Sequence, residues 1–486
     1  MAARRSTGTS ATTDESTGST DPTGTVAPDA TTAAFDAPIP APTERRAAAR
    51  ALRKMVARSA HAAWEAGVDR PDPVELLVEQ SRSRVPELVP LRFARMAQSP
   101  FAFLRGSALV MAHDLATTTD AGLEVRLCGD AHLANFGMFA SPERRVVFDL
   151  NDFDEAFPGP FEWDVKRLAA SLVVAARANG FDRLTARRAV LEAVAQYRDW
   201  TERYAAMTHL QVWYAKIDVR ELLDTSAASA AAQRRAQRYL TKAEGKNHLT
   251  ALSKLTVESE GRRRIVDDPP LVEHVASEAE LVPRLTALLS QYRATLSADR
   301  QALFDRYRFV DFARKVVGVG SVGTTCLITL YMAGAGDPLF LQVKEANASV
   351  LEPYAGKSHH ANHGQRVVVG QRLMQSASDI FLGWTHGTRG RHFYVRQLRD
   401  MKLSAIIEGM DVELLRAHGE SCAWALARAH ARSGDAASIS GYIGSGRTFD
   451  SAVAAFSVEY ADQAERDYAA FVEAHRDGRV EAADDF

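Results

Sequence analysis

Three residues in the first third of the chain have the types and the spacing that phosphate chemistry needs. Asp130 and Asn135 lie five residues apart in one polar loop, and Asp152 comes shortly after the apolar run Val146–Leu150. An aspartate can orient or accept the proton of a substrate hydroxyl. An asparagine amide oxygen and a second aspartate can hold a divalent cation against phosphate oxygens. The pattern therefore indicates an aspartate-assisted reaction beside a bound metal ion.

The acidic residues around Asp152 leave two alternatives open. Asp149, Asp154 and Glu155 lie close by and add hard oxygen ligands, so Asp149 or Asp154 can replace Asp152 at an ion such as Mg²⁺. Asn, Asp and Gly are also the residues that ordinary turns between strands use. The metal-binding interpretation is favoured because both polar segments follow apolar, strand-like runs.

A glycine-rich segment lies almost 190 residues further along the chain. Gly318, Gly320 and Gly323 form a G-x-G-x-x-G pattern that includes Ser321. The residues that follow are β-rich rather than helical, so the loop is expected to join two strands and cover phosphates, not to begin a dinucleotide-binding helix. Lys344 comes 21 residues after Gly323, near the spacing of the kinase lysine that contacts the α- and β-phosphates. Taken alone, the glycines can mark a hairpin and the lysine a solvated strand end.

The acidic partner of Lys344 is not identified by the sequence. Glu345 and Glu352 are near it in the chain, but the next predicted helix contains no Glu. Gln371 or Gln375, which lie on that helix, can face the lysine instead.

Other charged residues are weaker candidates for the same site. Arg105 is a candidate phosphate contact, although a helix cap or an ion pair explains it equally well. Residues 399–402 are expected to form a hinge that meets adenine. Asp379, Arg396 and Lys402 can contact phosphate or an acidic substrate, but a solvated rim is the favoured interpretation.

The order of the predicted elements indicates an α+β fold in which helices come first, then a sheet, then helices again. Residues 1–43 are expected to be a disordered tail, because 32 of them are Ala, Ser, Thr, Gly or Pro. Residues 44–300 are expected to be a helical part with the catalytic and metal loops. Residues 301–402 are expected to form a sheet with the glycine loop and the lysine, and 403–486 a helical part that packs back on the first.

Apolar periodicity predicts the individual elements. Helices are expected from Thr43, over 163–208 with an interruption near Gly180, over most of 219–300, over 364–376 and from Asp411 onward. Strands are expected at 123–127, 146–150, 309–319, 324–332, 340–343 and 393–398, and breaks at 245–247, 269–270 and 438–445.

Composition excludes several classes of protein. The chain has 486 residues, is 46% hydrophobic and has a net charge of −2, which argues against a general nucleic-acid or membrane-surface binder. The longest apolar stretch, Leu168–Ala176, is too short to span a bilayer, and no signal-peptide pattern follows Arg4 and Arg5. Three isolated cysteines fit a reducing compartment. We expect a cytoplasmic protein with no nucleic-acid or membrane partner.

The loop 129–135, read as Gly-Asp-x-His-x-x-Asn, resembles the catalytic loop of aminoglycoside and choline phosphotransferases, which have the protein-kinase-like fold. The segment 152–156 before an apolar helix resembles their metal-binding segment. Cys128 departs from the pattern, because these families usually have His there. The resemblance implies that Asp130 is the catalytic aspartate, that Asn135 and Asp152 are Mg²⁺ ligands, that His132 structures the loop and that Asp164 braces it.

The pieces occur in the opposite order to that of kinase-like enzymes, where the glycine loop and lysine come first. Either one resemblance is accidental or the chain is circularly permuted, which proteins tolerate when their termini lie close together. A predicted helix over 413–431 resembles the one that leads into the phosphotransferase catalytic loop and supports permutation. The chain from about residue 45 is also similar to a bacterial family of unknown function grouped with kinase-like proteins, through segments 99–106, 129–137, 151–155 and 367–375.

These observations predict a two-lobed, circularly permuted kinase-like fold. The expected function is an ATP- and Mg²⁺-dependent phosphotransferase that acts on an unidentified hydroxyl acceptor, a small molecule. Two alternatives stay open, namely transfer of AMP by the same fold and a nucleotide-binding module without catalysis. The oligomeric state is not predicted.

Overall fold

A computed structural model describes residues 39–221, 230–245, 248–259, 262–274, 278–334, 336–398 and 401–483. Most of the expected tail, 1–43, and Arg399 of the expected hinge therefore lie outside the described residues. Residues Pro42–Phe486 form one compact unit, and the architecture given below is that of this unit. It is mixed α+β, as the sequence predicts.

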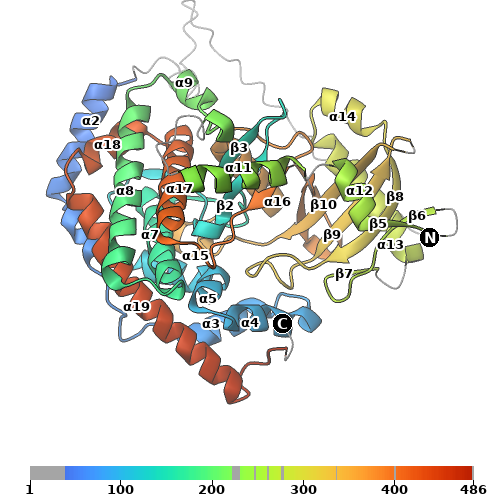
Figure 1. The fold of residues 1–486 in the computed structure, drawn as a ribbon, viewed down its shortest axis with the longest axis horizontal. Helices are drawn as coiled ribbons and strands as arrows, with labels where there is room; N and C mark the ends of the chain where they lie inside the picture. Colours follow the sequence, from blue (N-terminus) through green and yellow to red (C-terminus); the bar gives the residue numbers. More distant parts are fainter. Residues whose placement is uncertain are drawn as a thin grey trace, which may run out of the picture. The chain divides into compact units, whose positions relative to one another are not determined.

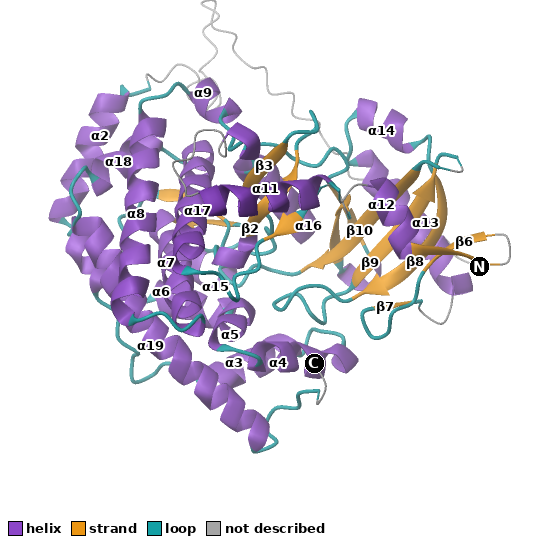
Figure 2. Cartoon of the chain, viewed as in Figure 1, coloured by secondary structure: helices purple, strands orange, loops and turns teal. Residues whose placement is uncertain are grey.

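An antiparallel sheet of six strands carries Lys344 (Figures 1 and 2). Lys344 lies near the end of β10 (Pro338–Ala346), a strand that is buried along almost its whole length. The strand order is β11-β12-β10-β9-β8-β7, so β10 is an interior strand. The other strands are β7 (Val272–Glu273), β8 (Arg308–Lys315), β9 (Cys326–Met332), β11 (Gly383–His386) and β12 (His392–Gln397).

Successive side chains of β10 point to opposite faces of the sheet, and the two faces pack against different helices. Leu339, Leu341 and Val343 pack in a cluster with residues of α13 (Glu278–Ala294) and α14 (Ala298–Phe304). The opposite face packs around Phe340 in a second cluster, with Ala251 of α12 (His248–Leu255). Lys344 lies on the same face of β10 as Phe340. Its side chain therefore points away from the apolar cluster formed with α13 and α14.

A smaller sheet of order β13-β2-β3 and a two-stranded ribbon hold the polar loops. The loop 129–135 connects β1 (Glu124–Leu127) to β2 (Phe136–Ala140). The sequence prediction placed this loop between the runs 123–127 and 146–150 and missed β2. The register shows that β2 pairs with β3 (Val146–Leu150) and β13 (Leu403–Ser404), whereas β1 pairs with β4 (Phe157–Pro160).

Long helices surround these strands with the largest apolar core of the described chain. The predicted helix over 163–208 is two helices, α7 (Phe161–Ala178) and α8 (Arg183–Ala205), which confirms the interruption at Gly180. The stacked indoles of Trp200 and Trp424, with ring centroids 4.1 Å apart, join α8 to α17. The C-terminal helices are α17 (Val412–Ser433), α18 (Ala436–Ile443) and α19 (Thr448–Arg476).

Shorter helices complete the unit. The prediction of a helix from Thr43 is confirmed by α2, and that of a helix over 364–376 by α16. The bounds are α2 (Pro42–Ala51), α3 (Pro73–Ser81), α4 (Val89–Ala97), α5 (Pro100–Gly106), α6 (Ala108–Ala116), α9 (His209–Tyr214), α11 (Ala230–Glu244), α15 (Glu352–Ala355) and α16 (His363–Met374).

Two predictions of secondary structure are wrong in part. The region 219–300 was expected to be helical, but the hairpin β5 (Thr256–Ser259) and β6 (Arg262–Ile265) separates α12 from α13. The charged residues of this hairpin are strand residues, and its β-branched residues Thr256, Val257 and Ile265 favour the extended backbone. The break expected at 438–445 is mostly helix α18, and the chain leaves the helix only at Gly444.

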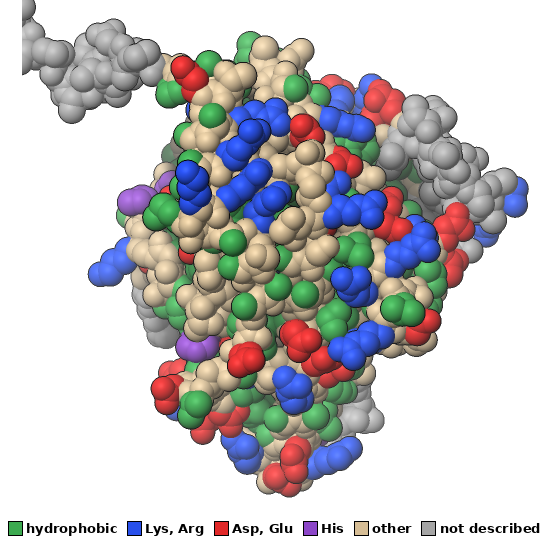
Figure 3. Space-filling model, turned by 90° about the vertical axis from the view of Figure 1, so that its left-hand side faces the viewer, with side chains coloured by type: hydrophobic (Ala, Val, Ile, Leu, Met, Phe, Trp, Pro, Cys, Tyr) green, Lys and Arg blue, Asp and Glu red, His purple; other side chains and the backbone are tan. Residues whose placement is uncertain are grey.

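The surface carries charges of both signs. Figure 3 shows basic side chains gathered over the upper part of one face, and acidic side chains mainly below them. No helix in the described ranges is long and apolar enough to cross a membrane. Cys128, Cys326 and Cys422 are all buried and unpaired.

Candidate active site

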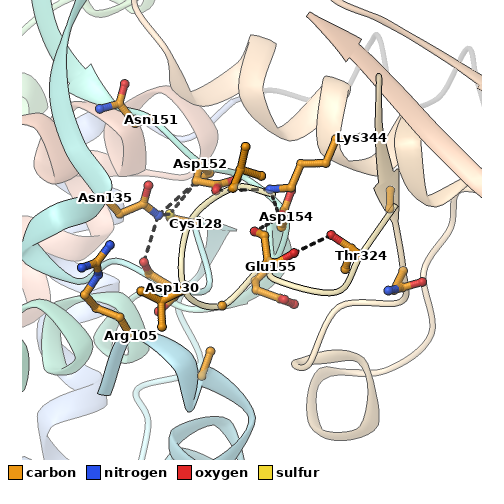
Figure 4. Close-up of a pocket in the computed structure, with 18 of the residues that line it drawn as sticks. Arg105, Cys128, Asp130, Asn135, Asn151, Asp152, Asp154, Glu155, Thr324 and Lys344 are labelled. Atoms are coloured by element: carbon orange, nitrogen blue, oxygen red, sulfur yellow. Dashed lines mark hydrogen bonds and ion pairs between the residues drawn. The ribbon is translucent and has the colours of Figure 1, made fainter. Parts of the chain in front are cut away.

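A cleft of about 830 Å³ collects the polar loops and one end of the six-stranded sheet (Figure 4). This size is typical of pockets that bind small molecules or cofactors. Gly323 is outside the lining and packs against Arg84. The other seven predicted site residues all line the cleft, namely Asp130, Asn135, Asp152, Gly318, Gly320, Ser321 and Lys344.

Asp164, at the start of α7, fixes the beginning of the loop 129–135. Its carboxylate accepts hydrogen bonds from the backbone N–H groups of Cys128 (2.7 Å) and Gly129 (3.0 Å). The ring of His430 lies 3.3 Å from the same carboxylate, which is almost fully buried. The bracing role that the resemblance implied for Asp164 therefore agrees with its contacts.

Among the described residues, hydrogen bonds hold the carboxylate of Asp130 through one oxygen only. Its Oδ1 accepts hydrogen bonds from Nε (2.9 Å) and Nη2 (2.7 Å) of Arg167, a residue of α7 that the sequence interpretation did not single out. Its Oδ2 lies 3.6 Å from Nε2 of His132. Burial, together with Arg105 and Arg167, lowers the pKa of His132 to about 4, so the ring is neutral at pH 7. The Oδ2 oxygen is thus available to a ligand proton.

Asn135 presents its amide oxygen in a fixed direction. Its Nδ2 donates hydrogen bonds to the backbone carbonyls of Asp130 (3.0 Å) and Asp152 (3.2 Å). Among the described residues, nothing donates a hydrogen bond to its Oδ1. Asn135 therefore joins the loop 129–135 to the segment that contains Asp152, and its own Oδ1 remains available at the cleft.

Lys344 finds its acidic partner in the polar segment after β3. Its Nζ forms a close ion pair with Asp154 and lies 3.5 Å from Oδ2 of Asp152. Asp154 also accepts hydrogen bonds from the Tyr394 hydroxyl (2.9 Å) and the Ser321 hydroxyl (3.2 Å). Lys344, the residues 152–155 (the acidic segment) and the glycine loop therefore meet at the carboxylate of Asp154.

The other candidate partners of Lys344 make no hydrogen bond to it, and Oε1 of Gln371 is buried without a partner among the described residues. Gln371 donates to Gln375 (2.8 Å), and Gln375 donates to the carbonyl of Leu150 (2.6 Å). Glu345 accepts from the backbone N–H of Thr325 (3.0 Å). Lys344 therefore pairs with Asp154 and not with Gln371 or Gln375, although both glutamines line the same cleft.

The charges of this cluster stabilise one another. Burial alone would lower the pKa of Lys344, but Asp152 and Asp154 outweigh it and raise that pKa well above its usual value. Burial would raise the pKa of Asp152, yet Lys344, Arg396 and Lys402 hold it well below its usual range. Burial and the neighbouring Arg396 lower the pKa of Lys402 to about 7. At neutral pH the cluster contains an ionised Asp152 and an ionised Lys344.

Of the two rivals for the metal position, Asp149 is excluded by its surroundings. It is fully buried, lies outside the cleft lining and pairs with Nη2 of Arg428 at 2.5 Å. Its second oxygen accepts hydrogen bonds from the backbone N–H and the hydroxyl of Ser376. Asp154 remains at the cleft, but Lys344 neutralises it, so Asp152 is the more available carboxylate.

The glycine loop is fastened to the helical segment that precedes the polar loops in the chain. Nη1 of Arg84 donates to the carbonyl of Val322 (2.6 Å), and Nη1 of Arg95 donates to the carbonyl of Gly318 (2.6 Å). A third bond joins two backbone groups, because the N–H of residue 85 donates to the carbonyl of residue 323 (2.7 Å). Together they close the loop against residues 84–95, an attachment that the pattern of the glycines did not indicate.

Arg366 of α16 is a second residue that the sequence interpretation missed. Its guanidinium donates to the backbone carbonyls of Asp154 (2.7 Å), Ala156 (2.8 Å) and Asn347 (2.8 Å). It is almost fully buried. Arg366 therefore joins the acidic segment to the chain that leaves β10, and it occupies the helix next to the lysine strand where the sequence offered no Glu.

Comparison with known proteins identifies a family but no activity. The family model described as "uncharacterized protein conserved in bacteria" (DUF2252) matches residues 84–474. The chain belongs to this bacterial family. No curated protein and no solved structure shows a significant match.

The DUF2252 region contains the whole of the predicted site. The polar loop 129–135, the acidic segment, the glycine loop and Lys344 all fall within residues 84–474. So do the residues that the structure adds, Arg167 and Arg366. The wall of the cleft formed by Glu79, Gln80 and Ser83 lies just before this region.

The cleft is lined both by the end of β12 in the six-stranded sheet and by residues at β13 in the smaller sheet. Gln397 and Leu398 line the cleft at the end of β12, and the next strand, β13, pairs with β2 of the smaller sheet. Lys402 lies 3.4 Å from the carbonyl of Asn151, and Arg396 lies 3.3 Å from the same oxygen. Both side chains are half-buried and line the cleft, so they belong to the wall of the candidate site as well as to its solvent-facing edge.

Gly129 should be the most sensitive glycine of the loop 129–135. Its φ is +80°, and a Cβ there would lie 2.3 Å from the backbone carbonyl oxygen of Glu155. Gly122 is a matched control, because its φ is +69° and a Cβ there meets nothing within 4 Å. We expect Gly122→Ala to cost about 1–2 kcal/mol for its left-handed backbone, and Gly129→Ala to cost clearly more.

Urea denaturation of both variants measures this difference. A Gly129→Ala variant no less stable than Gly122→Ala would show that the contact between the loop and Glu155 is not needed for folding.

Proposed function

We propose that this protein is an ATP- and Mg²⁺-dependent phosphotransferase of kinase-like architecture that acts on a small hydroxyl compound. One observation carries the proposal. Lys344 of the six-stranded sheet and Asp152 of the acidic segment, 192 residues apart in the chain, meet in a cleft that Asp130, Asn135 and the glycine loop also line. Nothing in the packing of an ordinary core requires this combination of charges.

The arrangement around Lys344 supports the kinase-like interpretation. The glycine loop connects the antiparallel strands β8 and β9, the lysine lies on the next strand, and α16 follows before β11 and β12. This order of loop, lysine strand and helix is the one that kinases use for the phosphates of ATP. Because the catalytic loop comes earlier in the chain, we infer that the kinase-like unit is circularly permuted.

The residues present fit a magnesium ion. Mg²⁺ is commonly held by one or two carboxylates together with waters and substrate phosphates. Asp152 supplies an ionised carboxylate, and Asn135 supplies an amide oxygen that is already oriented. No group of three or more His, Cys, Asp or Glu side chains in the described ranges has a metal-binding arrangement, which agrees with a metal completed by the nucleotide. When bound, the ion would neutralise phosphate charge.

The chain's own groups would perform the remaining tasks. Lys344 and the backbone of the glycine loop would position the triphosphate, and Asp130 would orient the acceptor hydroxyl through Oδ2 while Arg167 holds Oδ1. The acceptor oxygen attacks the γ-phosphorus, and the bond from that phosphorus to the β,γ-bridging oxygen breaks. ADP leaves with the electron pair, and the hydroxyl proton passes to Asp130. Positioning and charge neutralisation supply most of the catalysis in this reaction class.

Nucleotide binding tests the proposal without a known acceptor. We expect ATP with Mg²⁺ to raise the melting temperature more than ATP alone or Mg²⁺ alone, because a ligand stabilises the state that binds it. Lys344→Ala should remove most of this shift. Lys357→Ala, at an exposed lysine outside the cleft, should retain it. Absence of a metal-dependent shift in the unmodified protein would contradict both the phosphotransferase and the AMP-transfer hypotheses.

Transfer of AMP is the second candidate. The absence of a glutamate partner for Lys344 on α16, where Arg366 binds backbone carbonyls instead, keeps this alternative open. ATP labelled at the α-phosphate or at the γ-phosphate separates the two reactions. Incorporation of the γ-label supports phosphoryl transfer, incorporation of the α-label supports AMP transfer, and metal-dependent binding without either indicates a binding module.

A further inference from the structure

Arg105 is a cation at the cleft whose guanidinium has no hydrogen-bond partner among the described residues. Five cationic side chains line the cleft in the described part of the chain: Arg84, Arg105, Lys344, Arg396 and Lys402. Each of the other four makes a hydrogen bond to a backbone or side-chain oxygen. The buried Nε of Arg105 is unsatisfied.

The structural roles that could explain Arg105 are filled by other residues. Arg105 lies in the last turn of α5, where a basic side chain often caps backbone carbonyls. However, the carbonyl of Leu104 accepts hydrogen bonds from Arg167 (2.6 Å) and from the backbone N–H of Ser107 (3.3 Å). The carbonyl of Gly106 accepts one from Arg92 (2.9 Å). These two carbonyls therefore have other donors, and no carboxylate of the described residues forms an ion pair with Arg105, although Glu408 and Asp130 lie within electrostatic range.

The surroundings of Arg105 place it on the acceptor side of the cleft. Figure 4 shows Arg105 beside Asp130 and Asn135, across the cleft from Lys344. Two carboxylates, those of Glu408 and Asp130, are close enough for their charges to act on Arg105, although neither forms an ion pair with it. The guanidinium carbon of Arg105 lies over the Phe101 ring, 6.0 Å from the ring centroid. The arginine is therefore next to the group that orients the acceptor hydroxyl and far from the lysine that would hold the nucleotide.

The neighbouring wall is polar and suits a hydroxylated compound. Glu79 and Gln80 of α3, Ser83 just after it, and His132 all line the same cleft. His132 is more than nine-tenths buried, and its Nδ1 has no hydrogen-bond partner. An unsatisfied buried donor or acceptor costs free energy until a ligand or water completes it.

We propose that Arg105 binds an anionic group of the acceptor, so that the substrate is a small hydroxyl compound that already carries a phosphate or a carboxylate. A guanidinium matches the planar, paired oxygens of either group. The identity of this compound as the acceptor rests on the proposed function, but the anion site itself depends only on Arg105 and its surroundings.

Three small probes of similar size test the site: glycerol 3-phosphate, glycerate and glycerol. They are titrated by isothermal calorimetry at constant ionic strength, with and without a saturating non-hydrolysable ATP analogue and Mg²⁺. We expect at least one anionic probe to bind at least about tenfold more tightly than glycerol, since a hydrogen bond to a charged group is worth about 1.5–3 kcal/mol. The better of the two anions identifies the phosphate or the carboxylate as the recognised group.

Substitutions of Arg105 test whether this side chain binds the anionic probe. Arg105→Gln should weaken the anionic probe by at least about tenfold, and Arg105→Lys, which retains the charge, should weaken it less. Arg476→Gln, at an exposed arginine of α19, should bind the probe as the unmodified protein does. Circular dichroism checks that the variants are folded, and the titrations of the unmodified protein give a result that does not depend on them.

Several outcomes would overturn the inference. These are equal binding of all three probes, unchanged binding in Arg105→Gln, or competition between the anionic probe and the nucleotide. A loss of nucleotide affinity in Arg105→Gln of about tenfold or more would assign the arginine to the triphosphate instead. If no nucleotide binds at all, the proposed function fails, while the titrations without nucleotide still show whether Arg105 holds an anion.

Discussion

Asp130→Asn is expected to lower phosphoryl transfer by about 10²–10⁴-fold while nucleotide affinity stays within a factor of about two. The asparagine can still accept the hydrogen bonds from Arg167, so the loop keeps its geometry, but it cannot take the proton of the acceptor hydroxyl. An alanine would be a poorer probe, because it would leave the nearly buried Arg167 without its anion. The difference between the unmodified protein and Asp130→Asn therefore reports on Oδ2 of Asp130, the oxygen that would take the proton.

The measurement uses γ-labelled ATP with Mg²⁺ and a dialysed mixture of small hydroxyl compounds, and it follows label in products and in free phosphate. Asp69→Asn is the matched control, because Asp69 is exposed and outside the cleft. Unchanged transfer in Asp130→Asn would remove Asp130 from the mechanism. A parallel loss of nucleotide binding would instead place Asp130 in the nucleotide site.

The second large effect concerns stability. Arg428→Ala should destabilise the fold by about 3–5 kcal/mol, because it leaves the carboxylate of Asp149 buried without its cation. Both side chains are completely buried, and Arg428 also donates to the carbonyl of Met374 at 2.9 Å. The contact joins α17 to β3 and to the end of α16, so its loss affects three elements at once.

Urea unfolding monitored by tryptophan fluorescence measures the effect. Arg476→Ala serves as the control and should change the free energy of unfolding by no more than about 0.5 kcal/mol. The double variant Asp149→Asn with Arg428→Met should be less destabilised than the sum of its single variants, because no charge remains unpaired. Additive losses would mean that the ion pair does not couple the two positions.

The sequence was most informative where local pattern decides the structure. The run Val146–Leu150 is a strand with those bounds, and the runs before and after the glycines are the antiparallel pair β8 and β9. Strands of this kind are rich in β-branched and aromatic residues. Their pattern of apolar residues can therefore be recognised in the sequence without knowledge of the neighbouring strands. The strand β11 was missed because its four residues, Gly383–His386, contain no such period.

The candidate site was predicted in its residue types but not in its partners. Asp130, Asn135, Asp152 and Lys344 could be selected because their spacing is characteristic. Their contacts could not be predicted, since Lys344 pairs with Asp154 across 190 residues of chain. Residues such as Arg167, on an apolar helix with no motif of its own, acquire their role only when the fold brings them to the loop.

The attachment of the glycine loop has a consequence for kinetics. A ligand beneath residues 318–323 can leave past this loop only if the carbonyls of Gly318 and Val322 separate from Arg95 and Arg84, or if the segment 84–95 moves with the loop. Opening of a loop over an active site often limits the turnover rate of enzymes. We therefore expect that weakening either arginine loosens the loop and shortens the residence time of a ligand bound beneath it.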